Sequence, residues 1–143
     1  MSLPTVAERY SLRKPKDPNI YSDFLTDLNF HPQTNKLLAV VNEAAVSRSI
    51  RNLLLTNKYE RLFQPEIGSN IQSILFEDIS GHTTSAIEVA IRETIENFEP
   101  RARLVKVIAT PYYEKNGYVI TVVFYILNES ETVTINVPLY RVR

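Results

Sequence analysis

Three carboxylates, Glu77, Asp78 and Glu99, are the side chains whose type could support acid–base chemistry in this sequence. Glycoside hydrolysis needs two carboxylates that flank the scissile bond, about 5–5.5 Å apart for retention or 6.5–9.5 Å for inversion. With sixteen acidic residues, however, such candidates arise readily. Arg101 beside Glu99 favours the ionised carboxylate, which is the wrong direction for a general acid. Because no tryptophan is available to stack on a sugar, a hydrolase stays an alternative only.

Other site chemistries have even less support. His31 and His82 are far apart and belong to no ligand motif, and cysteine is absent. The absence of cysteine excludes thiolate catalysis and disulfides. The three glycines are not clustered, so no phosphate-binding loop is present. We therefore expect neither a cofactor nor a metal.

The composition is that of a globular domain with no charge bias. The 143 residues are 44% hydrophobic and 22% charged, which is typical of one soluble domain. Sixteen basic residues balance sixteen acidic ones, whereas nucleic-acid binding draws on excess cationic side chains. No apolar run approaches the roughly 20 residues of a membrane helix. We expect a chain made in the cytoplasm that binds neither nucleic acid nor membrane.

Residues 1–35 form the first of two expected regions, an N-terminal extended arm, and residues 36–143 form a single domain. Prolines at four positions make long regular elements in the arm improbable: Pro4, Pro15, Pro18 and Pro32. Two interpretations remain open, an unstructured leader and an arm that becomes ordered on a partner. The second is favoured by four aromatic residues that could serve as anchors: Tyr10, Tyr21, Phe24 and Phe30.

The middle of the chain carries apolar residues at helical spacing and predicts three helices. These helices are expected over 42–55, 71–76 and 84–97, the last ending near Glu99 because Pro100 cannot continue a helix. The candidate N-caps are Asn42 for the first helix, Ser69 or Asn70 for the second, and Thr83 or Thr84 for the third. Glu88 and Arg92 have the spacing of an ion pair on the third helix.

The last third predicts three antiparallel strands, over 103–113, 118–127 and 132–139. Asn116-Gly117 between the first two is a strong signal for a type I′ hairpin turn. The middle strand is apolar on both faces, which predicts a sheet covered on both sides. Because helices precede strands along the chain, the fold class is α+β: an irregular N-terminal arm, helices, then a three-stranded antiparallel β-meander.

Glu99-Pro100-Arg101 joins the long helix to the sheet and allows two interpretations. Opposite charges on either side of a rigid proline could lock the corner internally, or they could present fixed charges to a partner. A pair buried against a partner would matter by roughly 3–5 kcal/mol, and an exposed pair by less than about 1 kcal/mol.

The last strand alternates, with Val133, Ile135 and Val137 predicted to face inward. It carries no charge between Glu131 and Arg141 and a single proline, Pro138. This is light protection for a free edge, whose unpaired backbone groups can accept a strand from another chain. The pattern therefore suggests that a partner covers the edge.

Five short motifs, taken in order, resemble the baseplate wedge and sheath-initiator family of contractile-tailed bacteriophages, a family shared with type VI secretion baseplates. Some members of that family carry a lysozyme label. The resemblance runs from about residue 21 to residue 137. The motifs are Tyr21-Ser22-Asp23-Phe24, Arg51-Asn52-Leu53-Leu54, Arg61-x-Phe63-x-Pro65-x-x-Gly68, Leu75-Phe76-Glu77 and Glu99-Pro100-Arg101.

The resemblance implies a non-enzymatic structural subunit in the virion tail baseplate, assembled in the host cytoplasm with several copies per ring. It implies that Glu99, Pro100 and Arg101 bind the core helical bundle of neighbouring wedge proteins. It also implies that the strand with Val133, Ile135 and Val137 templates the first ring of tail sheath protein, and it makes the tail tube a further candidate partner. A generic adaptor domain is the remaining alternative, and it would have no reason to carry the ordered motifs.

Overall fold

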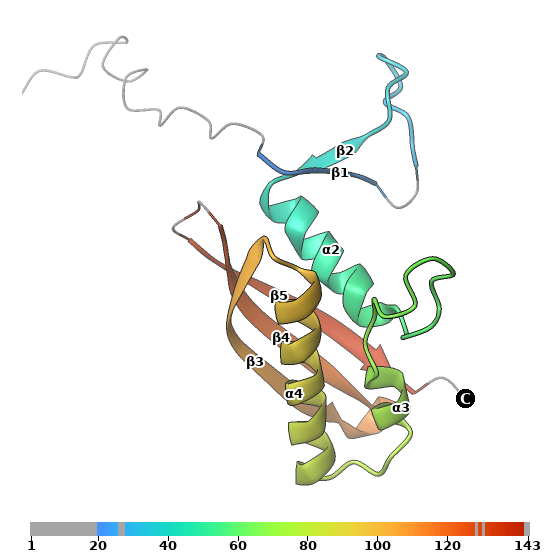
Figure 1. Ribbon diagram of the computed structural model, residues 1–143, viewed down its shortest axis with the longest axis vertical. Helices are drawn as coiled ribbons and strands as arrows, with labels where there is room; N and C mark the ends of the chain where they lie inside the picture. The colour runs from blue at the N-terminus through green and yellow to red at the C-terminus, as the bar shows by residue number, and fades with distance from the viewer. Residues whose placement is uncertain (1–19, 26–27, 128, 130, 142–143) are drawn as a thin grey trace, which may run out of the picture. The chain divides into compact units, whose positions relative to one another are not determined.

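A computed structural model describes residues 20–25, 28–127, 129 and 131–141 of the chain. Helices and strands follow one another in the segregated order of an α+β protein (Figure 1), which confirms the predicted fold class. The chain divides into two compact units, residues 1–45 and residues 46–143.

The first unit contains a two-stranded hairpin that the sequence did not predict. Strand β1 (Ser22–Phe24) pairs antiparallel with β2 (Ala39–Val41). The side chain of Asn42 accepts hydrogen bonds from the backbone N–H groups of Ile20 and Tyr21, at 3.0 and 3.3 Å. Asn42 therefore ties the hairpin ends together, which is a different role from the predicted helix N-cap. Among the described residues from 20 to 44, none is buried.

The predicted arm over 1–35 is described only in part. Tyr10 and three of its four prolines lie outside the described residues, so its role and the boundary at residue 35 stay predictions. Phe24 and Phe30 are 58% and 60% exposed, as side chains without an intramolecular core would be.

All three predicted helices form, and the starts of the first and third are shifted by one and three residues. They are α2 (Glu43–Leu55), α3 (Ile71–Leu75) and α4 (Gly81–Phe98). Ser80 caps α4, because its Oγ accepts from the backbone N–H of Thr83 at 3.1 Å; the predicted caps Thr83 and Thr84 lie inside the helix. No side chain caps α3, since the Ser69 hydroxyl donates to the Leu54 carbonyl instead, at 2.8 Å. Among the described residues, no helix has the length and apolar character that crossing a membrane requires.

The predicted meander forms as a three-stranded antiparallel sheet in the order β3 (Ala102–Tyr112), β4 (Gly117–Ile126), β5 (Thr132–Tyr140). The predicted type I′ turn at Asn116-Gly117 is wrong. A 3-10 turn, η1 (Tyr113–Lys115), precedes Asn116, and Asn116 alone of the pair has a positive φ, of 46°. Gly117 belongs to β4, where a Cβ would lie 2.3 Å from the carbonyl oxygen of Leu139. The glycine is therefore needed for close approach of the strands, and not for a turn.

The core of the second unit lies between the helices and one face of the sheet. Helices α2 and α4 both cover that face (Figure 1). The strand side chains on it are buried: Val107, Ala109, Tyr118, Ile120, Val122, Phe124, Ile126, Val133, Ile135, Val137 and Leu139. On the other face of β4, Val119 and Val123 are only half-buried and Tyr125 is 40% exposed. The prediction of a sheet covered on both sides is therefore wrong for the described residues.

Candidate protein-binding site

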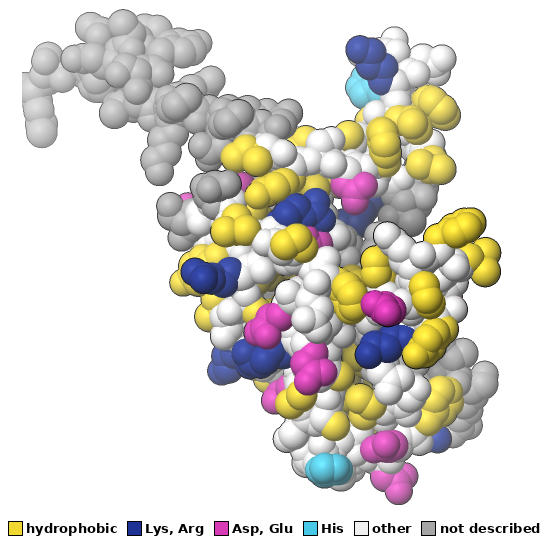
Figure 2. All heavy atoms as spheres, in the orientation of Figure 1, with side chains coloured by type: hydrophobic (Ala, Val, Ile, Leu, Met, Phe, Trp, Pro, Cys, Tyr) yellow, Lys and Arg dark blue, Asp and Glu magenta, His cyan; other side chains and the backbone are white. Residues whose placement is uncertain are grey.

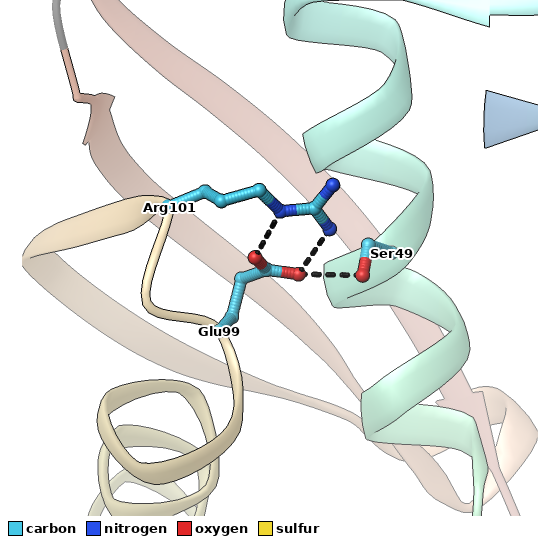
Figure 3. A network of polar contacts seen from close by, with 3 residues as sticks. All are labelled: Ser49, Glu99 and Arg101. Carbon is cyan, nitrogen blue, oxygen red and sulfur yellow. Dashed lines mark hydrogen bonds and ion pairs between the residues drawn. The ribbon is translucent and has the colours of Figure 1, made fainter. Parts of the chain in front are cut away.

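Glu99 carries a buried carboxylate at the corner between α4 and β3. The residue is 2% exposed. Arg101 donates to it twice, from Nε to Oε1 at 2.6 Å and from an Nη to Oε2 at 2.8 Å. The hydroxyl of Ser49, on α2, donates to the same Oε2 at 2.5 Å (Figure 3). The carboxylate thus fastens α2 to the helix–sheet corner, fifty residues away in sequence.

The backbone fixes the same corner. The N–H of Glu99 donates to the Ile95 carbonyl at 2.9 Å and ends α4, and the N–H of Ala102 closes a turn onto the Glu99 carbonyl at 3.1 Å. The carbonyl of Arg101 accepts from Leu127 at 3.0 Å, which extends the pairing of β3 with β4. Pro100, between the two charges, is exposed. The turn therefore holds Glu99 inside while Pro100 faces solvent.

The electrostatics of the corner favour the ionised carboxylate. Burial by itself raises the pKa of Glu99, but the hydrogen bonds from Arg101 and Ser49 and the charge of Arg101 together hold the pKa below its ordinary value. A carboxyl with a lowered pKa is a poor general acid. The side chain of Arg101 is 30% exposed, so the guanidinium is both positioned by Glu99 and accessible from outside.

Strand β5 lies at one edge of the sheet, and its register determines which residues face that edge. The N–H of Arg141 donates to the Asn116 carbonyl at 3.2 Å, and Gly117 is the partner of Tyr140. Antiparallel pairs alternate between hydrogen-bonded and non-hydrogen-bonded. The backbones of Val133, Ile135 and Val137 therefore bond to β4, and their side chains, 6%, 8% and 1% exposed, lie in the core.

The alternate residues of β5 turn their N–H and C=O groups outward: Thr132, Thr134, Asn136, Pro138 and Tyr140. Pro138 fits this assignment, because proline has no N–H and is tolerated where that position faces away from the sheet. The alternation in the sequence located the strand and its two faces. It led to the inward-facing residues being named as the residues that pair with a partner. The groups available for pairing belong to the outward ones.

Strand β3 lies at the opposite edge, and that edge is blocked. The N–H of Ala109 donates to the carboxylate of Glu88, on α4, at 2.9 Å. Pro111 lacks an N–H, and a bulge interrupts the register between Leu104 and Lys106. Covered edges, prolines and bulges are the usual means of preventing strand addition. Glu88 therefore accepts a hydrogen bond from this edge. The spacing in the sequence had predicted an ion pair of Glu88 with Arg92 instead.

The remaining candidates from the sequence do not converge. Glu77, Asp78 and His82 are exposed, and His31 is half-buried. Nowhere in the described ranges do three or more of the residue types histidine, cysteine, aspartate and glutamate gather closely enough to hold a metal ion. Sequence reasoning missed Ser49, because nothing local in α2 indicates a partner fifty residues away.

Among the described residues, the sheet of this α+β domain has one blocked edge and one uncovered edge, and an uncovered edge is available for strand addition by a partner. Sequence comparison identifies the class of protein: the profile of the family described as baseplate wedge protein gp25 matches residues 40–131. The chain belongs to this family of structural baseplate proteins of contractile tails. The baseplate wedge protein gp25 of Enterobacteria phage T4 is 30% identical over 90 residues, which are 60% of this chain and 68% of the phage protein.

Solved structures share the fold. A protein of Geobacter sulfurreducens described as a tail lysozyme is 27% identical and covers 73% of this chain and 96% of its own, with a TM-score of 0.65. A chain of the anti-feeding prophage baseplate, determined with sixfold symmetry, is 23% identical, with a TM-score of 0.60 over 86% of this chain and 87% of that chain. The profile match and the phage T4 relative confirm the family resemblance found in the sequence.

Proposed function

We propose that this chain is a baseplate subunit of the virion tail that starts the sheath by pairing its β5 edge with a strand of the sheath protein. The single observation that carries the proposal is the asymmetry of the sheet. The β3 edge is blocked by Glu88, Pro111 and a bulge, while β5 turns four N–H donors outward from an uncharged strand. These donors belong to Thr132, Thr134, Asn136 and Tyr140.

The test removes one outward donor without disturbing the pairing of β5 with β4. Thr134→Pro deletes an N–H that faces away from the sheet, and the natural Pro138, four residues later, lacks the N–H at an equivalent outward position. Thr134→Val keeps the N–H and changes only the side chain. We expect baseplates with Thr134→Val to initiate sheath normally and those with Thr134→Pro to initiate few or none, as counted by electron microscopy.

Folding of both variants is checked by circular dichroism before the count. Sheaths of normal number and length on folded Thr134→Pro baseplates would contradict strand pairing at this edge. Deleting residues 133–143 is a poorer test, because it removes the buried side chains of Val133, Ile135, Val137 and Leu139 and so the fold as well.

We further propose that the Glu99-Pro100-Arg101 corner contacts the helical bundle of neighbouring wedge proteins. The support is geometric: Glu99 holds the Arg101 guanidinium in one orientation, and Arg101 and Pro100 are the members with accessible surface. A pre-positioned guanidinium loses less conformational entropy when it binds. In this arrangement Glu99 is a positioning residue, and Arg101 makes the contact.

The matched test is co-purification of wedge proteins with the tagged chain and with its Glu99→Gln/Arg101→Gln variant. Changing both residues removes both charges together and leaves no buried charge unpaired. We expect the folded double variant to lose capture. Equal capture by both chains would assign the corner to internal architecture alone. A hydrolase role is not proposed, because Glu99 is enclosed and its carboxylate is already bonded to Arg101 and Ser49.

A further inference from the structure

The loop between α2 and α3 presents two adjacent apolar side chains to solvent. Leu62 is 92% exposed and Phe63 is 97% exposed; together they are called the loop tip. The loop projects away from the helices (Figure 1), and Figure 2 shows hydrophobic side chains gathered at its outer end. Adjacent leucine and phenylalanine side chains this exposed are costly in water, which marks the tip as a contact site.

Hydrogen bonds within the loop and at its base hold the loop in one conformation. The N–H of Tyr59 donates to the Pro65 carbonyl at 2.7 Å and closes the loop. At its base, the N–H of Ser69 donates to the Thr56 carbonyl at 2.8 Å, and the N–H of Asn57 donates to the Glu60 carboxylate at 2.8 Å. Tyr59 has a positive φ of 69°, a strained conformation for a non-glycine residue that persists where the surroundings impose it. A pre-organised tip binds with little loss of entropy.

The outer face of α4 offers a complementary surface in the same unit. A shallow groove of about 440 Å³ is lined by six residues of this helix: His82, Ser85, Ala86, Val89, Ala90 and Glu93. Its floor is made of small apolar side chains, and Val89 is 54% exposed. The groove is open to solvent, so an apolar side chain from outside the chain can pack against its floor.

The loop tip does not occupy the groove of its own chain, because Leu62 and Phe63 are almost fully exposed. Charge also matches across the two surfaces: Arg61 adjoins the tip, and Glu93 lines the groove. The loop as a whole is balanced, with Lys58 and Arg61 against Glu60 and Glu66. That balance favours a protein surface over an anionic membrane, which would attract a net positive loop.

We propose that the loop tip of one chain inserts into the α4 groove of a second copy. The contact joins two different surfaces, so it is head-to-tail and generates a ring or a filament. A phenylalanine buries about 150–250 Å², whereas a standard interface buries about 800 Å² per partner. The isolated contact is thus weak, and it gains strength when many copies are held together. This proposal goes beyond the function proposed above and uses neither the β5 edge nor the Glu99 corner.

Cysteine cross-linking of the purified full chain tests the contact, because the natural sequence has no cysteine. Leu62→Cys and Val89→Cys chains are mixed and oxidised. We expect mixed dimers several-fold above either homodimer, and above a control mixture of Leu62→Cys with Thr134→Cys chains. Adding Phe63→Ser to the Leu62→Cys chain should reduce mixed dimers to the control level.

Charge reversal provides a second measurement with the same readout. Arg61→Glu or Glu93→Arg should each lower the yield of mixed dimers, and combining them on the two partner chains should restore it. Predominant Leu62–Leu62 dimers would show a tip-to-tip contact and overturn the proposal. Mixed dimers no more abundant than the control would also overturn it and leave the tip to a different protein, with the sheath and wedge assignments untouched.

Discussion

At the scale of single residues, the ion pair of buried Glu99 with Arg101 makes a measurable contribution to stability. Arg101→Ala removes the two hydrogen bonds of the guanidinium and leaves a buried carboxylate bonded to Ser49 and to the backbone of residue 101. Because Arg101 is partly exposed, we expect a loss of roughly 2–3 kcal/mol in the free energy of unfolding, less than for a fully buried pair. Urea denaturation measures it, and Arg51→Ala, at an exposed position of α2, is the control for loss of an arginine elsewhere on the chain. A loss below about 0.5 kcal/mol would contradict the buried-clamp geometry.

The same pair gives the protein a defined dependence on pH. The pKa of Glu99 is lower in the folded chain than its ordinary value of 4.5. Its contribution to stability is therefore complete above that value and is lost as the pH falls through the folded pKa. We expect the stability difference between wild type and Glu99→Gln to be largest at pH 7 and to shrink below pH 4.5. Urea midpoints across this range measure it, and an unchanged difference at low pH would rule the linkage out.

At the scale of elements, Gly117 and Gly81 differ in the space available to a side chain. A Cβ at Gly117 would meet the Leu139 carbonyl oxygen at 2.3 Å, whereas nothing lies within 4 Å of a Cβ at Gly81. We expect Gly117→Ala to destabilise the chain by at least about 2 kcal/mol, because backbone must move. Gly81→Ala, in the first turn of α4, should be neutral or stabilising by less than about 1 kcal/mol. Thermal unfolding of the two variants side by side gives the comparison.

Local patterns predicted the elements well, and their limits are physical. Apolar spacing located α2, α3 and α4, and alternation located β5, because both depend on neighbours in sequence. The role of Gly117, the bond from Glu88 to Ala109 and the link from Ser49 to Glu99 depend on residues far away in the chain. For the same reason, the corner residues were identified while the part of Ser49 was not. The sequence of β4 is apolar on both faces. That pattern does not show that the chain's own helices cover only one of them.

At the scale of the whole molecule, the buried side chains of the described residues lie in the second unit, apart from Ala45. Among the described residues before Ala45, none is buried, and the family match begins at residue 40. We expect a chain that starts at residue 40 to have the same free energy of unfolding as the full chain, within about 0.5 kcal/mol, because little buried apolar area is lost. Urea denaturation of the two chains measures the difference. A clearly lower midpoint would mean that the first 39 residues contribute to the fold.

The unequal edges of the sheet also set a limit on growth. An open-ended β-assembly needs every subunit to offer a strand on two sides, as amyloid does. Here pairing that enters at β5 cannot leave through β3, since Glu88 and Pro111 close that side. Two copies could join β5 to β5 and then stop. Under the proposed strand pairing, such a subunit would begin a β-paired polymer of another protein and would be unable to extend a β-paired polymer of its own.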